Sequence, residues 1–232
     1  FMSFEYKLNN DDFYSARLGL IVLQSDETIE QEFRSSIDDQ KLALYHSRIP
    51  SQPTVTPQTL ATMHDDLPKA AELLSSSIQF DVIGYACTSG ATVIGSELVK
   101  SLVQSKHKNV CVTDPIDSAV ASFKKLNCKK IAFVSPYEAS VTTLLSNHIK
   151  DKGFEIVKTI SFDEKNESAV ARIREEDSLR AIVEVANSEC DCVFISCTNL
   201  KTFSIINEAE KEIGKPVISS NSALLWNMMK LA

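Results

Sequence analysis

The 232-residue sequence lacks several features that would assign it to a broad class of proteins. No apolar run approaches the ~18 residues of a transmembrane helix. The first twelve residues lack the basic and apolar regions of a secretory signal, so we expect a cytoplasmic protein that does not span a membrane. The net charge is −7 and the basic residues are scattered, so a basic surface for nucleic acid is not expected either.

Sequence motifs for cofactors and metals are also missing. The chain has no GxGxxG and no P-loop, and its four histidines are not clustered, which disfavours a Cys-His hydrolase. The segment "CDC" at 190–192 is a weak match to a metal motif, because no histidine lies nearby and strand alternation places Cys197 on the opposite face. We therefore expect no cofactor and no metal, and we interpret the six cysteines as reduced thiols.

The sequence does contain short apolar runs that alternate with amphipathic segments. Continuous apolar runs are typical of strands covered on both faces, so the alternation predicts an α/β fold with parallel sheets. Pro68 is expected to kink or split the helical stretch 57–77. The predicted strands are 17–23, 42–47, 80–86, 109–113, 130–135, 154–160, 192–196 and 216–220.

The order of these segments repeats along the chain. "GLIVLQS" resembles "AFVSPYE", "DVIGYACTSGAT" resembles "CVFISCTNLKT", and "VCVTDPIDSA" resembles "VISSNSALLW", all at nearly the same offset. The repetition predicts two pseudo-twofold-related Rossmann-like lobes, each with a four-stranded parallel sheet flanked by helices. The predicted parts are a tail at 1–16, lobe 1 at 17–114 with the C-terminal helix 221–232 packed back on it, and lobe 2 at 115–220.

Cys87 and Cys197 differ from the other four cysteines because each follows an apolar strand and precedes a turn of small and hydroxyl residues. Open α/β sheets bind ligands at the carboxyl ends of their strands, so the two thiols are expected to face one shared cleft. Backbone N–H groups of such turns favour negative charge, which predicts a thiol pKa below the usual ~8.5 and a place for a substrate carboxylate. The alternative, expected for the other four, is that a buried cysteine acts as a small apolar residue.

Two thiols that face one small carboxylate can support two reactions without a cofactor. One thiolate can remove a proton next to the carboxylate while the other thiol returns a proton on the opposite face, which is racemisation. Alternatively, one thiolate can add to an electron-poor double bond, which becomes a single bond that rotates before elimination, with the second thiol as acid. The residues alone leave both reactions open.

At "GYACTSGATVIG" and "FISCTNLKT" the sequence resembles the aspartate/glutamate racemase superfamily, in its maleate cis-trans isomerase branch. The resemblance covers nearly the whole chain, and "LYHSRIP" and "TPQTL" are similar to maleate-isomerase-like proteins of ectoine utilisation. It implies a double four-stranded α/β fold with the site between the lobes, Cys87 as nucleophile and Cys197 as proton donor. Arylmalonate decarboxylases have glycine in place of the first cysteine, so that activity is not expected. Relatives are often dimers, which allows a homodimer here.

The resemblance also marks substrate-binding residues, each with a structural alternative. Asp26 stands where the family has a carboxylate-binding asparagine, and an ionised Asp26 would repel a dicarboxylate. Asp26 is therefore protonated or turned away, or the natural ligand carries an amino group; capping of a helix from Glu27 is compatible with each interpretation. Tyr137 matches a carboxylate-binding tyrosine or packs at a helix start, and Asn166 contacts substrate or caps a helix. The residues expected to supply amides and hydroxyls are Thr88, Ser89, Thr198 and Asn199.

Two other functions stay open on the sequence. One is an amino-acid racemase or an ectoine-degradation enzyme that uses the two cysteines as an acid/base pair. The other is a two-lobed small-ligand-binding protein, which would need the cleft but no reactive thiol. Arg48 is expected either to attract an anionic substrate or to form a structural salt bridge.

Overall fold

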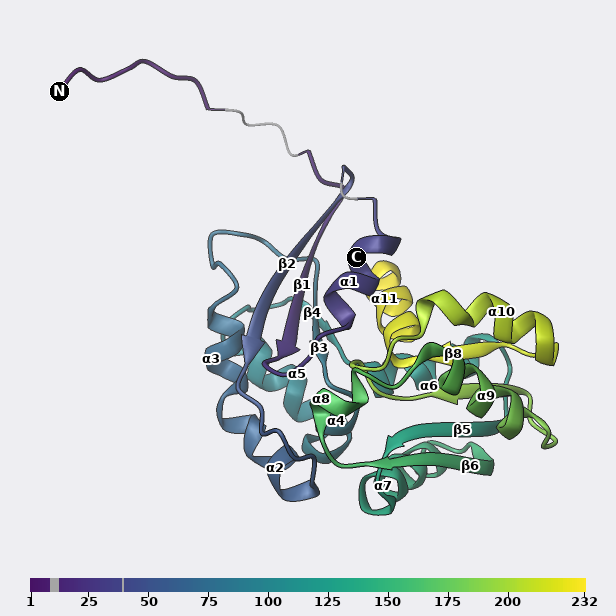
Figure 1. Cartoon of the computed structure of the whole chain (residues 1–232). Coiled ribbons are helices and arrows are strands. Elements are labelled where there is room, and N and C mark those ends of the chain that lie inside the picture. Colours follow the sequence, from purple (N-terminus) through teal and green to yellow (C-terminus); the bar gives the residue numbers. More distant parts are fainter. Residues whose placement is uncertain (9–12, 39) are drawn as a thin grey trace.

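The computed structural model describes residues 1–8, 13–38 and 40–232, and it contains two four-stranded parallel sheets flanked by helices (Figure 1). The strand orders are β2-β1-β3-β4 and β6-β5-β7-β8, the same topology twice, which confirms the predicted fold class. The strands are β1 (Ala16–Leu23), β2 (Leu42–Ile49), β3 (Val82–Ala86), β4 (Cys111–Thr113), β5 (Lys130–Tyr137), β6 (Glu155–Glu164), β7 (Cys192–Ile195) and β8 (Val217–Ser219). The helices are α1 (Ile29–Ser36), α2 (Pro57–Ala61), the 3-10 helix η1 (Thr62–Asp65), α3 (Leu67–Glu72), α4 (Thr88–Ile94), α5 (Ser96–Gln104), α6 (Pro115–Lys125), α7 (Ala139–Asp151), α8 (Glu167–Val170), α9 (Glu175–Ala186), α10 (Phe203–Ile213) and α11 (Ser220–Leu231).

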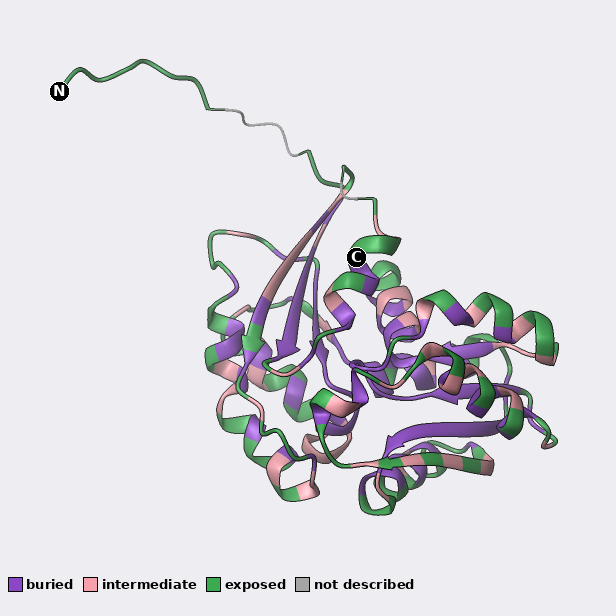
Figure 2. Ribbon diagram, in the orientation of Figure 1, coloured by how far each residue is buried: buried purple, intermediate pink, exposed green. Residues whose placement is uncertain are grey.

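The central strands are buried on both faces, as their continuous apolar sequences predict (Figure 2). Every residue of β3 and β7 is buried, and in β1 and β5 only Arg17 and Lys130 near the strand starts are half-buried. The edge strand β6 instead alternates between exposed and half-buried residues along much of its length. It extends to Glu164, four residues beyond the predicted end, because an edge strand does not need a continuous apolar run.

Proline and glycine explain two local features of the helical layers. Pro68 divides the stretch 57–77, since proline has no N–H to donate inside a helix, and α2 and η1 end before α3 begins. Gly84 lies in β3 beneath α11, where a Cβ atom would come within 2.7 Å of the Met228 sulfur. Helix α11 therefore packs closely on β3, and it also contacts α6 and β4.

The two sheets are joined by polar contacts near the carboxyl ends of their strands. Glu32 of α1 accepts hydrogen bonds from the backbone N–H groups of Thr202 (2.6 Å) and Phe203 (2.9 Å) at the start of α10. The Asn221 side chain donates to the other Glu32 oxygen (2.7 Å). A buried carboxylate at a helix N-terminus is favoured by the helix dipole, so these bonds fix the first half of the chain against the second.

The lobe boundaries and the tail stay a prediction, although β1 begins at Ala16 and residues 1–8 are exposed, without helix or strand. Residues 9–12 of the predicted tail lie outside the described residues. Within the described part of the chain, no helix is long and apolar enough to cross a bilayer.

Candidate active site

Cys87 lies directly after β3 and caps the N-terminus of α4. Its backbone is extended (φ −148°), and the Gly90 N–H donates to the Cys87 sulfur (3.2 Å). A Cβ atom at Gly90 would come within 2.6 Å of the Tyr85 hydroxyl and 2.8 Å of the Cys87 sulfur. Glycine is therefore required here so that the turn can approach the thiol closely.

Cys197 occupies the equivalent place after β7, but its backbone differs. Its φ of +102° lies in a region that non-glycine residues rarely adopt, and a turn follows instead of a helix. The Asn199 N–H donates to the Cys197 sulfur (3.3 Å), and the Cys197 N–H donates to the Ser220 hydroxyl (3.0 Å). Strained backbone of this kind concentrates at functional sites, where the surrounding structure holds it in place.

A buried tyrosine and a buried glutamate are linked to the Cys197 thiol by hydrogen bonds. The Tyr137 hydroxyl lies 2.9 Å from the Cys197 sulfur and donates to Glu167 Oε1 (2.8 Å). A phenol has one proton to donate, so the Cys197 S–H is left to donate to the Tyr137 oxygen. The result is a chain of hydrogen bonds from thiol to phenol to carboxylate. Tyr137 thus lies beside one of the two thiols that the sequence analysis selected.

Glu167 was missed by the sequence analysis, which selected its neighbour Asn166. The Asn166 side chain is exposed and caps α8 through the Ser168 N–H (2.9 Å), the alternative role foreseen for it. Glu167 instead points inward and is 3% exposed. The structure therefore places a carboxyl, and not the expected amide, beside Tyr137 and Asn199.

Asp26, in the turn after β1, is 4% exposed and uses only one of its carboxyl oxygens. Oδ1 accepts hydrogen bonds from the N–H groups of Thr28 (2.8 Å) and Ile29 (2.9 Å) in the turn that leads into α1. The helix starts at Ile29 with Thr28 as its N-cap, so Asp26 is not the N-cap of a helix from Glu27, as the alternative had it, although it bonds to the first N–H group of the helix. Oδ2 is buried without a hydrogen-bond partner, so one oxygen is left for a ligand.

The remaining predicted binding residues are buried around the two thiols. Asn199 spans the two halves of the chain: its side chain accepts from the Glu27 N–H (2.8 Å) and donates to Glu167 Oε2 (3.1 Å). Thr198 donates to the Ala86 carbonyl next to Cys87 (3.3 Å). The Thr88 hydroxyl bonds to that of Ser220 (2.7 Å), and Ser89 lies 3.8 Å from the Cys87 sulfur.

Comparison with known proteins identifies the family of this chain. Residues 51–232 match the model of the arylmalonate decarboxylase family. The chain belongs to this family. A maleate isomerase from Pseudomonas putida is 30% identical over 92% of this chain and 90% of that protein. Among solved structures, a Nocardia farcinica maleate cis-trans isomerase carrying a covalently bound succinylcysteine intermediate has a TM-score of 0.85 at 22% identity, covering 93% of this chain and 92% of the other. An arylmalonate decarboxylase variant in liganded form has a TM-score of 0.82 at 19% identity, covering 94% and 92%.

The electrostatics of this family member contradict the expected low thiol pKa. Burial, with a smaller contribution from the nearby Glu167 carboxylate, raises the pKa of Cys87 to about 12, because loss of solvent outweighs the Gly90 N–H. Burial and Glu167 also raise the pKa of Cys197 well above its ordinary value. Turn geometry is visible in a sequence, but the depth of burial is not. Both cysteines are therefore thiols in the ligand-free protein.

Other charged and thiol groups have structural roles. Arg48 forms a salt bridge with Glu30 (2.6 Å) and donates to the backbone carbonyls of Leu23 and Asp26, the structural alternative foreseen for it. No group of three or more His, Cys, Asp or Glu residues suited to a metal ion occurs among the described residues. Cys111 is exposed, which matters for any thiol labelling.

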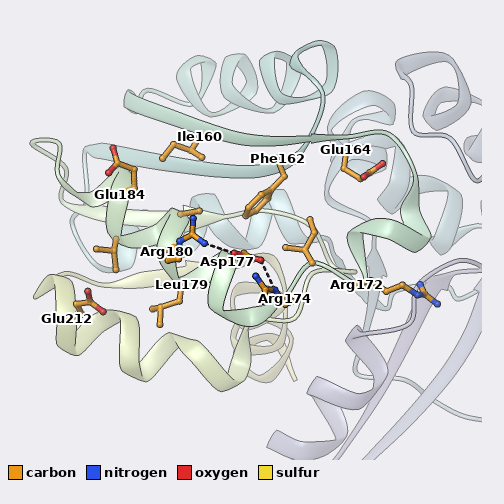
Figure 3. Close-up of a pocket in the computed structure, with 13 residues that line it drawn as sticks. Ile160, Phe162, Glu164, Arg172, Arg174, Asp177, Leu179, Arg180, Glu184 and Glu212 are labelled. Carbon is orange, nitrogen blue, oxygen red and sulfur yellow. Dashed lines mark hydrogen bonds and ion pairs between the residues drawn. The ribbon is translucent and has the colours of Figure 1, made fainter.

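A hollow of about 960 Å³ lies away from the thiols, on the second sheet between β6 and α9 (Figure 3). Phe162 of β6 and Leu179 of α9 contribute to its wall. Its arginines Arg174 and Arg180 both pair with Asp177, at 3.0 and 2.8 Å. Neither cysteine lines it, and its three arginines share the wall with four carboxyl groups, so the thiol site is the better candidate for chemistry.

Proposed function

We propose that this protein is a cofactor-independent isomerase of small carboxylates that uses the cysteine chemistry of maleate cis-trans isomerases. Cys87 is the nucleophile and Cys197 the proton donor. The main observation behind these roles is that the two thiols differ in their surroundings. Of the two, Cys197 bonds to the Tyr137–Glu167 pair, and this hydrogen bond holds the proton of the Cys197 thiol in place. The relatives named above support the reaction class, and the succinylcysteine of the Nocardia farcinica enzyme is the kind of adduct that it requires.

In the proposed reaction the Cys87 thiol first loses its proton to solvent as the substrate binds, and the remaining steps balance within the two sulfur atoms and the substrate. The Cys87 thiolate forms a C–S bond to one carbon of the double bond, and the displaced electron pair takes a proton from the Cys197 thiol at the other carbon. The resulting single bond rotates. The Cys197 thiolate then removes a proton from that carbon, the double bond forms again, and the C–S bond breaks to release the trans product and the Cys87 thiolate. In this proposal a substrate carboxylate binds to the backbone N–H groups of the turn after Cys87 and to the hydroxyls of Ser89 and Thr198.

A racemase is the second candidate, and Asp26 and Glu167 favour it, because buried carboxyl groups suit a substrate with an amino group better than a dicarboxylate. In that reaction the same two thiols act as base and acid on one carbon. A homodimer and a role in ectoine utilisation stay predictions from the resemblance, and a cytoplasmic location stays a prediction from the sequence.

Proton NMR of the protein with maleate, and with D- and L-aspartate and glutamate in D2O, tests the proposal. Isomerisation yields fumarate, and racemisation yields exchange of the α-proton for deuterium. A binding protein would give neither. Iodoacetamide labelling must use a Cys111→Ser background, since the exposed Cys111 would otherwise react first.

A further inference from the structure

Two carboxyl groups are buried beside the two thiols, one from each half of the chain. Asp26 follows β1 and Glu167 follows β6, and they are 4% and 3% exposed. Each affects the ionisation of the Cys197 thiol, and the charge of Asp26 also affects Glu167, so these groups lie within one region. A carboxyl group is rarely buried this deeply without a partner.

No basic side chain neutralises this pair within the described residues. Arg48, the cation that influences Asp26, donates to the Asp26 backbone carbonyl and pairs with Glu30 instead of the Asp26 carboxyl. Glu167 accepts from Tyr137 and Asn199, which are uncharged donors. Asp26 Oδ2 forms no hydrogen bond, and the side-chain donor that lowers the pKa of the Asp26 carboxyl, the Thr198 hydroxyl, is also uncharged. The site therefore has unused capacity to accept hydrogen bonds and no cation to balance a second negative charge.

We infer that the substrate of this site is a small monocarboxylate that also carries an N–H donor group, an ammonium or a primary amide, bound by Asp26 and Glu167. This inference rests on the proposed thiol chemistry and specifies its substrate class. Once ionised, the two buried carboxyls would repel the second anionic group of a dicarboxylate, whereas an N–H group would supply the hydrogen bond that Asp26 Oδ2 lacks.

The state of the thiols agrees with this substrate class. Burial and Glu167 raise the pKa of Cys87, and a bound dianion would raise this pKa further. An ammonium group, or an amide that donates to Glu167, would weaken the effect of the carboxylate on the thiol. Binding of such a substrate would therefore promote formation of the nucleophilic thiolate.

Two matched pairs of compounds test the substrate class. Maleamate and maleate differ by an amide in place of one carboxylate and report isomerisation; asparagine and aspartate differ in the same way and report α-proton exchange in D2O. We expect kcat/KM to be at least about tenfold higher for the amide member of whichever pair reacts. Asp26→Asn and Glu167→Gln should each lower this preference, mainly by raising kcat/KM for the dicarboxylate.

Asp114→Asn is the matched control. Asp114 is a buried carboxyl that caps α6 through the N–H groups of Ile116 (3.0 Å) and Asp117 (2.9 Å), and like Asp26 it accepts from the residues two and three positions further on. This substitution should leave the preference between the paired compounds unchanged. An equal effect at Asp114 and Asp26 would attribute the change to loss of buried charge in general and would overturn the inference.

The outcomes separate this inference from the proposed function. Equal or faster turnover of maleate or aspartate by the unmodified protein would overturn the substrate class and leave the thiol chemistry standing. If no compound reacts, the thiol chemistry fails, and the dissociation constants of the same four compounds, measured by calorimetry, still decide the substrate class. Tighter binding of the amide members then supports it, and tighter or equal binding of the dicarboxylates, or no binding of either kind, overturns it.

Discussion

The turns that carry Cys87 and Cys197 occupy equivalent places in two copies of one topology, yet they hold their sulfur atoms differently. Cys87 has relaxed extended backbone and caps a helix; the Gly90 N–H donates to its sulfur and the Ser89 and Tyr85 hydroxyls lie near it, but Tyr85 donates to Met63 and not to a carboxyl group. Cys197 has strained backbone and lies at the end of a hydrogen-bonded chain through Tyr137 to Glu167. The difference indicates a division of labour in which one thiol is free to attack and the other is held to deliver a proton.

The largest expected effect comes from replacing each cysteine. Both Cys87→Ala and Cys197→Ser should lower kcat for isomerisation by at least about 10⁴-fold, since the two act as a unit. Mass spectrometry of the intact protein should then separate them: with Cys197→Ser a covalent adduct accumulates on Cys87, whereas with Cys87→Ala no adduct forms. Cys128→Ala, which alters a buried thiol outside the site, is the control. An adduct in the Cys87→Ala variant would contradict the different roles assigned to the two cysteines.

A smaller effect is expected when the hydrogen-bonded chain is cut. Tyr137→Phe removes the hydroxyl between Cys197 and Glu167, and kcat should fall about 10²- to 10³-fold because the proton donor is no longer positioned. The yield of Cys87 adduct in a single turnover should be reduced much less. A Tyr137→Phe enzyme with unchanged kcat would show that the two turns do not differ in function.

The pH dependence of maleate turnover should reveal the two carboxyl groups. Burial raises the pKa of both Asp26 and Glu167, so each is neutral at low pH and becomes anionic only above its ordinary range. As the pH rises above the ordinary carboxyl range, repulsion of the dianion grows and opposes the gain in kcat/KM from ionisation of Cys87. The ratio of kcat/KM for an Asp26→Asn/Glu167→Gln double variant to that of wild type should therefore increase with pH, by about tenfold across the titration of the two carboxyl groups. The ratio cancels the ionisation of maleate itself, and a flat ratio would contradict the expected repulsion.

The smallest effect concerns the backbone and should have opposite signs at the two cysteines. At position 197, with φ of +102°, glycine should be more stable than alanine by about 1 kcal/mol, because it relieves the strain. At position 87, with extended backbone, alanine should be more stable than glycine by about 0.5–1 kcal/mol. Urea unfolding of the four variants measures both differences. If the difference in unfolding free energy between glycine and alanine had the same sign at both positions, the backbone of Cys197 would not be strained.

Much of the fold could be predicted from the sequence because its signals are local. Continuous apolar runs identify the central strands, and small and hydroxyl residues directly after a strand identify the turns of Cys87 and Cys197. Glu167 could not be found in this way. Asn166 and Glu167 are both suited to a helix start, and the path of the chain from the end of β6, where Asp163 has a positive φ, decides which of them faces inward. The prediction of a low thiol pKa was wrong for a similar reason, because the burial that raises the pKa results from the packing of both lobes.

A crystal structure of the Cys197→Ser variant soaked with maleamate or maleate tests the central claim most directly. The account predicts an adduct on the Cys87 sulfur, with the neighbouring substrate carbon about 3–4 Å from the serine hydroxyl that replaces the thiol at position 197. An adduct on another cysteine, or one whose neighbouring carbon lies out of reach of position 197, would contradict the assignment of both thiols to one substrate.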